Sequence, residues 1–93
     1  KGQIFLELGK EYMEKNEIAT ATGYLEKAEK LPLSPKQMDS LKKSKAHIFF
    51  KLGETYSDEK KLGESIKFYK MCEEIYPDSE IARLARKRRE LRE

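Results

Sequence analysis

The sequence predicts an all-α protein of about five helices, and two observations lead to this prediction. Apolar residues recur at intervals of three and four along most of the chain, which is the spacing of one helical face. In addition, a pattern of nine positions occurs twice, with an offset of 44 residues. Such a repeat is typical of stacked helical units that bury their apolar faces only against a neighbour.

The nine positions fall on two predicted helices in each copy. On the first helix, Phe5, Leu8, Gly9 and Tyr12 return as Phe49, Leu52, Gly53 and Tyr56. On the second helix, Ile18, Ala21, Leu25, Ala28 and Leu31 return as Leu62, Ser65, Tyr69, Cys72 and Ile75. We expect an antiparallel pair in each copy, in which Gly9 faces Ala21 and Ala28, because small side chains let helices approach closely.

Turn and capping residues predict where the helices begin and end. Asn16 separates the first two helices, and Pro32 ends the second one. Ser34 and Gln37 form a capping box, with Pro35 at the first helical position. The third helix then runs to about residue 57, a length of roughly 35 Å at about 1.5 Å per residue.

The fourth helix ends at Tyr76-Pro77, and a fifth helix over residues 79–92 is expected to cap the stack, with Asp78 as its N-cap. Its predicted inward stripe consists of Ile81, Leu84, Ala85, Arg88 and Leu91. The whole chain, 1–93, is expected to form one domain. Within it, repeat one covers residues 2–32, the linker 32–35, repeat two 35–77 and the basic capping helix 79–92.

Composition narrows the class of protein further. Charged residues make up 40% of the chain and apolar residues 38%, a balance that suits an exposed helical assembly. No apolar run is long enough to span a membrane, and a lone cysteine, Cys72, cannot form an internal disulfide. The chain starts at Lys1, so we expect a processed or trimmed product whose targeting segment has gone.

The repeat resembles the tetratricopeptide repeat, a helix-turn-helix unit of about 34 residues. The resemblance lies in the aromatic-x-x-Leu-Gly-x-x-Tyr pattern of the first helix and the small-x-x-x-large-x-x-small pattern of the second. Proline follows each copy, at Pro32 and at Pro77. The resemblance implies a module that holds other proteins.

A narrower similarity lies at the end of the second copy. The run Tyr76-Pro77-Asp78-Ser79, followed by Ala82 and Ala85, resembles a junction of bacterial envelope tetratricopeptide proteins such as the D-subunit lipoprotein of the β-barrel assembly machinery. This similarity implies an adaptor at the periplasmic face of the outer membrane, with an outer-membrane assembly subunit as partner and membrane attachment only through a lost N-terminal lipid anchor. A soluble cytoplasmic adaptor is the alternative.

The resemblance to tetratricopeptide proteins also implies a concave partner-binding groove along the first helices of the two copies. The matching positions are Gln3, Leu6, Lys10 and Met13 in copy one and His47, Phe50, Glu54 and Ser57 in copy two. Leu6, Met13 and Phe50 are apolar residues outside the packing stripe, so we expect an exposed interaction surface, with Leu6 and Met13 near an open edge. In the alternative, Leu6 and Phe50 simply pack between the repeats.

The basic tail offers a second candidate site. Its residues outside the predicted stripe are Arg83, Arg86, Lys87 and Arg89. A basic helix can dock an acidic protein, nucleic acid or an anionic lipid surface. No aromatic residue is interleaved with these cations, so we expect protein docking or a solvated face, with nucleic acid or an anionic surface as the alternative.

The sequence predicts no enzymatic activity, and neither a cofactor nor a metal site. His47 is the lone histidine, and no second histidine or cysteine supports metal binding there. Cys72 could in principle pair with His47 as a nucleophile. However, it occupies the position that Ala28 holds in copy one, so we expect a buried structural thiol. The function expected from the sequence is that of a non-enzymatic protein-binding adaptor.

Overall fold

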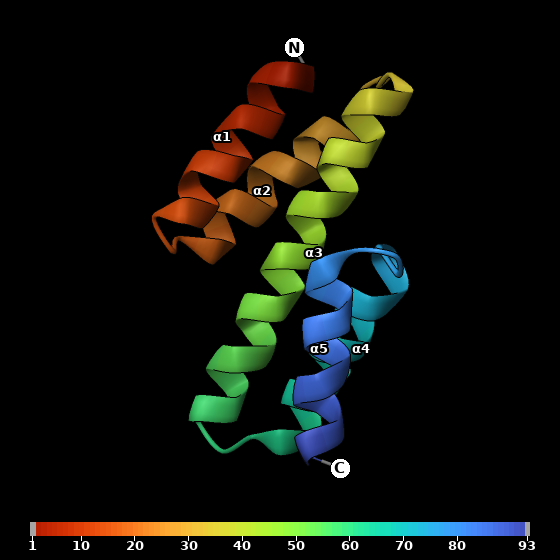
Figure 1. Cartoon of the computed structure of the whole chain (residues 1–93). Coiled ribbons are helices and arrows are strands. Elements are labelled where there is room, and N and C mark those ends of the chain that lie inside the picture. Colours follow the sequence, from red (N-terminus) through yellow and green to blue (C-terminus); the bar gives the residue numbers. More distant parts are fainter. Residues whose placement is uncertain (1, 93) are drawn as a thin grey trace. The chain divides into compact units, whose positions relative to one another are not determined.

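The computed structural model describes residues 2–92, and every regular element in this part of the chain is a helix (Figure 1). The helices are α1 (Gly2–Glu14), α2 (Ile18–Glu29), α3 (Pro35–Asp58), α4 (Leu62–Ile75) and α5 (Glu80–Arg92). The predicted all-α fold of five helices is thereby confirmed. None of these helices combines the length and the hydrophobicity that crossing a bilayer requires.

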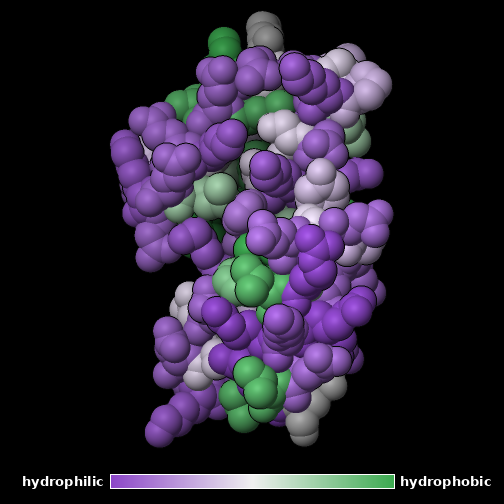
Figure 2. Space-filling model, in the orientation of Figure 1, coloured by the Kyte–Doolittle hydropathy of each residue, from purple (hydrophilic) through white to green (hydrophobic). Residues whose placement is uncertain are grey.

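The chain divides into two compact units, Lys1–Lys45 and Ala46–Glu93. Unit 1 contains the α1–α2 hairpin and the start of α3, whereas unit 2 contains the rest of α3 with α4 and α5. The prediction of a single domain over residues 1–93 stays a prediction. Hydrophobic side chains reach the visible surface only in small separate patches (Figure 2), as the high charge content of the chain requires.

The predicted start of α3 is confirmed in detail. The Ser34 hydroxyl accepts a hydrogen bond from the Gln37 amide at 3.1 Å, and the Gln37 side-chain oxygen accepts one from the Ser34 amide at 2.9 Å. This reciprocal pair satisfies two amides that a helix start leaves without intrahelical partners. Pro35, the first residue of α3, has no amide hydrogen to satisfy.

The predicted N-cap of α5 is wrong by one residue. Ser79, and not Asp78, immediately precedes the helix, and its hydroxyl accepts a hydrogen bond from the Ala82 amide at 3.1 Å. The same hydroxyl donates to the Tyr76 carbonyl at 2.7 Å. Capping depends on the side chain directly before the first helical residue, and Asp78 lies one position too early to fill that place.

The repeat continues through the hairpin turns, which the sequence comparison did not include. Asn16 and Lys60, which are 44 residues apart, both adopt a φ of 63°. In each turn the amide of the following residue donates to the backbone carbonyl of a tyrosine in the preceding helix. The Glu17 amide donates to the Tyr12 carbonyl at 2.9 Å, and the Lys61 amide donates to the Tyr56 carbonyl at 2.8 Å. Asparagine tolerates this left-handed conformation, whereas lysine adopts it only where the surrounding structure imposes it.

Each hairpin is closed by one stack of three aromatic rings. In unit 1 the Tyr24 ring lies 6.3 Å from Phe5 and 5.5 Å from Tyr12, measured between ring centroids. In unit 2 the rings of Phe49, Tyr56 and Phe68 repeat this arrangement, with corresponding distances of 6.3 and 5.4 Å. Tyr24 and Phe68 therefore form a tenth repeated pair, which the sequence comparison missed although the offset is the same.

Gly9 and Gly53, which occupy the same position in the two copies of the repeat, both lie at close contacts between helices. A Cβ atom at Gly53 would lie only 2.8 Å from two carbons of the Tyr69 ring. At Gly9 a Cβ would lie 2.7 Å from a Leu25 methyl carbon and 3.4 Å from the Ala21 carbonyl, so Leu25 takes the place in which Ala28 was expected. The Ser65 hydroxyl also donates to the Gly53 carbonyl at 2.7 Å, a buried bond between α4 and α3.

We predict that Gly53→Ala lowers stability although alanine favours helix formation over glycine by about 1 kcal/mol. Overpacking against the fully buried Tyr69 ring costs about 1–3 kcal/mol and outweighs that gain. Gly63→Ala is the matched control, because a Cβ there meets nothing within 4 Å, and it should be neutral or stabilising. Denaturant unfolding of both variants tests this, and an equal effect of the two would contradict the contact.

Candidate protein-binding site

The four predicted groove residues of unit 1 do not form an exposed apolar surface. Gln3 and Lys10 are exposed on α1. Leu6 and Met13, expected near an open edge, are only 3% and 8% exposed and belong to the hydrophobic core. Burying a large apolar side chain contributes roughly 1.5–3 kcal/mol, so these two residues serve packing, and the exposed surface predicted for them is absent.

Phe50, predicted in the groove of unit 2, is also covered, being 8% exposed. Its ring packs edge-on against Tyr69, with 5.6 Å between centroids. From α5, the guanidinium of Arg88 lies over the Phe50 ring, 5.2 Å from its centroid. Phe50 is therefore a packing residue within unit 2, where α5 supplies part of its cover. Packing between the repeats, the alternative considered for it, stays a prediction.

The next two groove residues of unit 2 also face arginines of α5. Arg88 donates to the Glu54 carboxylate at 2.6 Å, a half-exposed ion pair in which this hydrogen bond to Glu54 raises the pKa of Arg88. One turn further along, Arg92 donates to the Ser57 hydroxyl at 2.8 Å, and its guanidinium lies 5.3 Å from the centroid of the Tyr69 ring. The groove face of unit 2 thus already holds a helix.

Small residues let α5 approach this face. Ala82 and Ala85 are buried, and Ala85 joins a core cluster with Phe50, Tyr69 and Cys72. The predicted inward stripe is partly wrong, because Leu84 and Leu91 are 42% and 82% exposed. Their side chains lie away from the alanine side of the helix, and the small Ala85 side chain allows the close approach to Tyr69 and Cys72.

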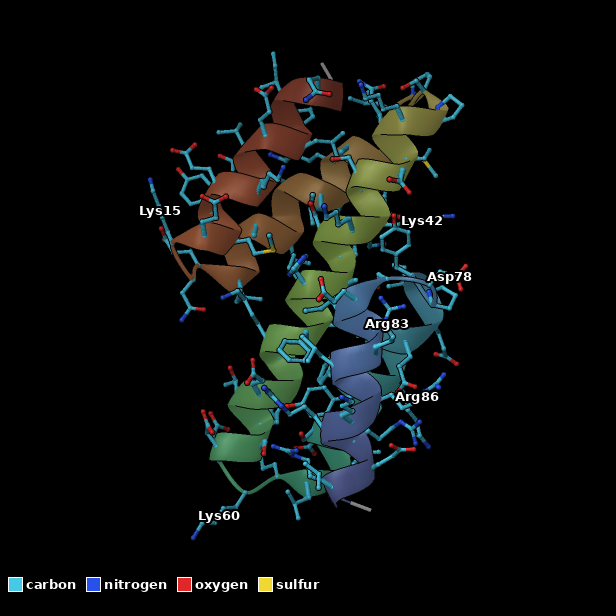
Figure 3. The ribbon with its side chains drawn as sticks, viewed as in Figure 1. Lys15, Lys42, Lys60, Asp78, Arg83 and Arg86 are labelled. Atoms are coloured by element: carbon cyan, nitrogen blue, oxygen red, sulfur yellow. The ribbon has the colours of Figure 1, made fainter. Side chains whose placement is uncertain are left out.

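The four residues of the predicted basic docking surface have different environments. Arg83, Arg86 and Lys87 are exposed on α5. Figure 3 labels Arg83 and Arg86 on this helix. Arg89 is not part of that surface, because it is largely buried and binds the Glu73 carboxylate of α4 through two hydrogen bonds of 2.7 and 3.2 Å. Arg86 adds a weaker contact to Glu73 at 3.5 Å.

The remaining candidate residues, Cys72 and His47, lie on α4 and α3. Cys72 is buried as expected, and desolvation, assisted by the nearby charge of Glu73, raises its thiol pKa to about 11. Its sulfur faces the Ile81 carbonyl at 3.9 Å. His47 is half-buried on α3. Residues 2–92 contain no group of three or more histidine, cysteine or acidic side chains that could hold a metal ion.

Sequence reasoning placed Arg88 on the inward stripe of the fifth helix, but it missed Arg92 and the contacts of both arginines with the groove. Arg88 and Arg92 are four residues apart and follow Ala85 by three and seven positions, so all three lie on one helical face. This spacing was visible in the sequence. Glu73 of α4, which pairs with Arg89 and Arg86, was also missed.

A comparison with protein families agrees with the geometry of unit 2. Residues 46–79 match the model of the tetratricopeptide repeat. The match starts at the first residue of unit 2 and ends at Ser79, directly before α5. It supports a tetratricopeptide repeat protein, and such repeats generally mediate binding to other proteins.

No curated protein and no solved structure matches the chain. The narrower resemblance to envelope proteins therefore stays a prediction, as do the expected partner and location. The Tyr76-Pro77-Asp78-Ser79 junction on which it rests has a local structural role in this chain, since Ser79 caps α5 and bonds to the Tyr76 carbonyl.

We predict that Glu73→Gln reduces stability at neutral pH by roughly 1–2 kcal/mol, the usual contribution of a charge-assisted hydrogen bond. The hydrogen bond from Arg89 lowers the pKa of Glu73 below its ordinary value of 4.5. The stabilisation is therefore complete above that ordinary value and is lost as pH falls through the folded-state pKa.

Unfolding free energies of wild type and Glu73→Gln should therefore differ at pH 7 and converge at acidic pH. Glu74→Gln is the control, since Glu74 is exposed on the same helix. A stability difference for Glu73→Gln that stayed constant down to the acid range would contradict the pairing with Arg89.

We also predict that Cys72 resists alkylation in the folded protein. At pH 8 its raised pKa leaves little thiolate, and burial blocks the approach of a reagent. Reaction with iodoacetamide should be at least about a hundredfold slower than in denaturant, as expected for a fully protected group. Rapid labelling of the folded chain would contradict the buried, structural position of this thiol.

Proposed function

We propose that the protein is a non-enzymatic adaptor that holds another protein through the helical face of unit 2. The observation that carries this proposal is the tetratricopeptide match over residues 46–79 together with the contacts on its first helix. Phe50 and Glu54, at positions expected to recognise a partner, are engaged by side chains of a helix. This face is therefore suited to helical ligands.

Nucleic-acid binding through the tail is the less favoured function. Arg88, Arg89 and Arg92 are engaged by Glu54, Glu73 and Ser57. The exposed cations of α5 are Arg83, Arg86 and Lys87, and Glu80 and Glu90 lie exposed on the same helix. Phosphate binding gains affinity from each cation that neutralises a phosphate, and this mixed surface provides few of them.

The specific setting that we propose is outer-membrane protein assembly at the periplasmic face of the bacterial outer membrane. It is supported by the sequence similarity of the Tyr76–Ser79 junction and not by any matching protein. A soluble cytoplasmic adaptor is the competing proposal. Cell fractionation of the native organism separates the two, since recovery in the cytosolic fraction would exclude the envelope setting.

The adaptor function predicts capture of a defined protein from native lysate by the full chain. The captured protein, prepared separately, should bind the chain at a fixed ratio in calorimetry at physiological salt. Nuclease treatment of the lysate should leave the capture unchanged. Retention that disappears with nuclease and has a steep salt dependence would contradict the adaptor and favour the nucleic-acid function.

A further inference from the structure

The face of unit 2 that α5 covers has the features of a binding site with a resident occupant. We propose that this face, formed by Phe50, Glu54, Ser57 and Tyr69, recognises a helix with the pattern Ala-x-x-Ala-x-x-Arg-x-x-x-Arg. The chain supplies its own occupant, α5, in which these positions are Ala82, Ala85, Arg88 and Arg92. A partner helix with the same pattern displaces α5. This inference rests on the proposed adaptor function and names the chemistry of the ligand.

The two alanines set the distance between the occupant helix and the face. Ala85 is fully buried against the cluster that contains Phe50, Tyr69 and Cys72. Ala82 is buried one turn earlier. A larger side chain at Ala85 would have to displace members of this fully buried cluster, and one at Ala82 would need space that the buried position does not offer, so the face selects small residues at these two positions of any helix that it binds.

The two arginines are recognised by charge and by aromatic faces together. Glu54 and the Phe50 ring hold the first arginine, and Ser57 and the Tyr69 ring hold the second. A guanidinium can donate in its plane and stack on a ring at the same time, whereas the compact ammonium of lysine does so poorly. The face therefore distinguishes arginine from lysine, and the spacing of four fits one side of a helix.

The resident helix does not satisfy the face completely. The Tyr69 hydroxyl is buried and has no hydrogen-bond partner among the described residues. Arg88 of α5 interacts with it electrostatically, but without the geometry of a hydrogen bond. Arg88 already contacts this hydroxyl, so a partner helix gains affinity at this position only by bringing a better-aligned hydrogen-bond partner.

The contacts that hold α5 to the rest of unit 2 are weak enough for the helix to detach. Two of its three large apolar residues, Leu84 and Leu91, are exposed, and its buried apolar contact comes from Ala82, Ala85 and the partly buried Ile81. The Arg88–Glu54 pair is half exposed, so salt weakens it. The Arg89–Glu73 pair, on the other side of α5, is the more buried of the two and holds the helix to α4.

The test uses the full chain and a fluorescent synthetic peptide of residues 80–92, with anisotropy as the measurement. In wild type the tethered α5 competes at an effective concentration on the order of 1 mM, so the peptide binds weakly. Arg88→Ala weakens the tethered helix by one charge-assisted contact, and the peptide should then bind about tenfold more tightly. Arg83→Ala, at an exposed position of the same helix, should bind the peptide as wild type does.

A charge exchange tests whether the peptide occupies the proposed face. A peptide with Arg88→Glu should not bind the Arg88→Ala chain, and it should bind the Glu54→Arg chain. A peptide with Arg88→Lys should bind the Arg88→Ala chain several-fold more weakly than the natural peptide does. Circular dichroism monitors folding of each chain, and Arg92→Ala serves as the second release variant if Arg88→Ala does not fold.

Absence of peptide binding to both release variants at concentrations on the order of 1 mM would overturn the proposal. A wild-type dimer in which α5 of one copy occupies unit 2 of the other would also overturn it, because the occupant would then be a second copy. If a captured protein binds the chain while the peptide fails, the adaptor function stands and this site is wrong. If the peptide binds and no protein is captured, the adaptor function fails instead.

Discussion

The packing around the Tyr69 ring is the constraint on which the rest of unit 2 depends. The ring is fully buried, and it lies so close to Gly53 of α3 that a Cβ there would force the ring to shift. On another side it meets Phe50, and Arg92 of α5 lies over its face. One side chain of α4 thus sets the separation from α3 and provides a surface for α5. Each copy combines a glycine, a small residue (Ala21 or Ser65) and a large side chain (Leu25 or Tyr69) at these places because the three volumes are interdependent.

The sequence predicted most of the fold because the repeat displays packing requirements directly. Glycine at a close contact, a capping box at Ser34 and a proline after each copy are local signals, and each appeared where it was expected. The N-cap of α5 was misplaced because Asp78 and Ser79 are both good capping residues, and only the exact start of the helix decides between them. The strained turn at Lys60 carries no local signal, since lysine does not prefer that conformation.

The candidate site was harder to predict than the fold because the sequence shows which residues are charged but not which of them are exposed and which are paired. The sequence placed Leu6 and Phe50 on a groove face, but it did not show whether another segment covers them. Likewise Arg83, Arg86 and Arg89 were assigned to one basic surface, whereas Arg88 was placed on the inward stripe. The structure separates them into exposed cations such as Arg83 and paired ones such as Arg88 and Arg89. Pairing depends on acidic residues distant in sequence, Glu54 and Glu73, and this distance hides it from pattern analysis.

The central claim is that α5 is a separable occupant of a face built by α3 and α4. Hydrogen exchange of the full chain, followed amide by amide, tests it most directly. Amides of α5 should exchange through an opening of lower free energy than those of α4 around Tyr69, and added salt should lower that opening free energy further. Exchange of α5 and α4 only together, in one global unfolding event, would contradict the claim and would make α5 an integral part of the core.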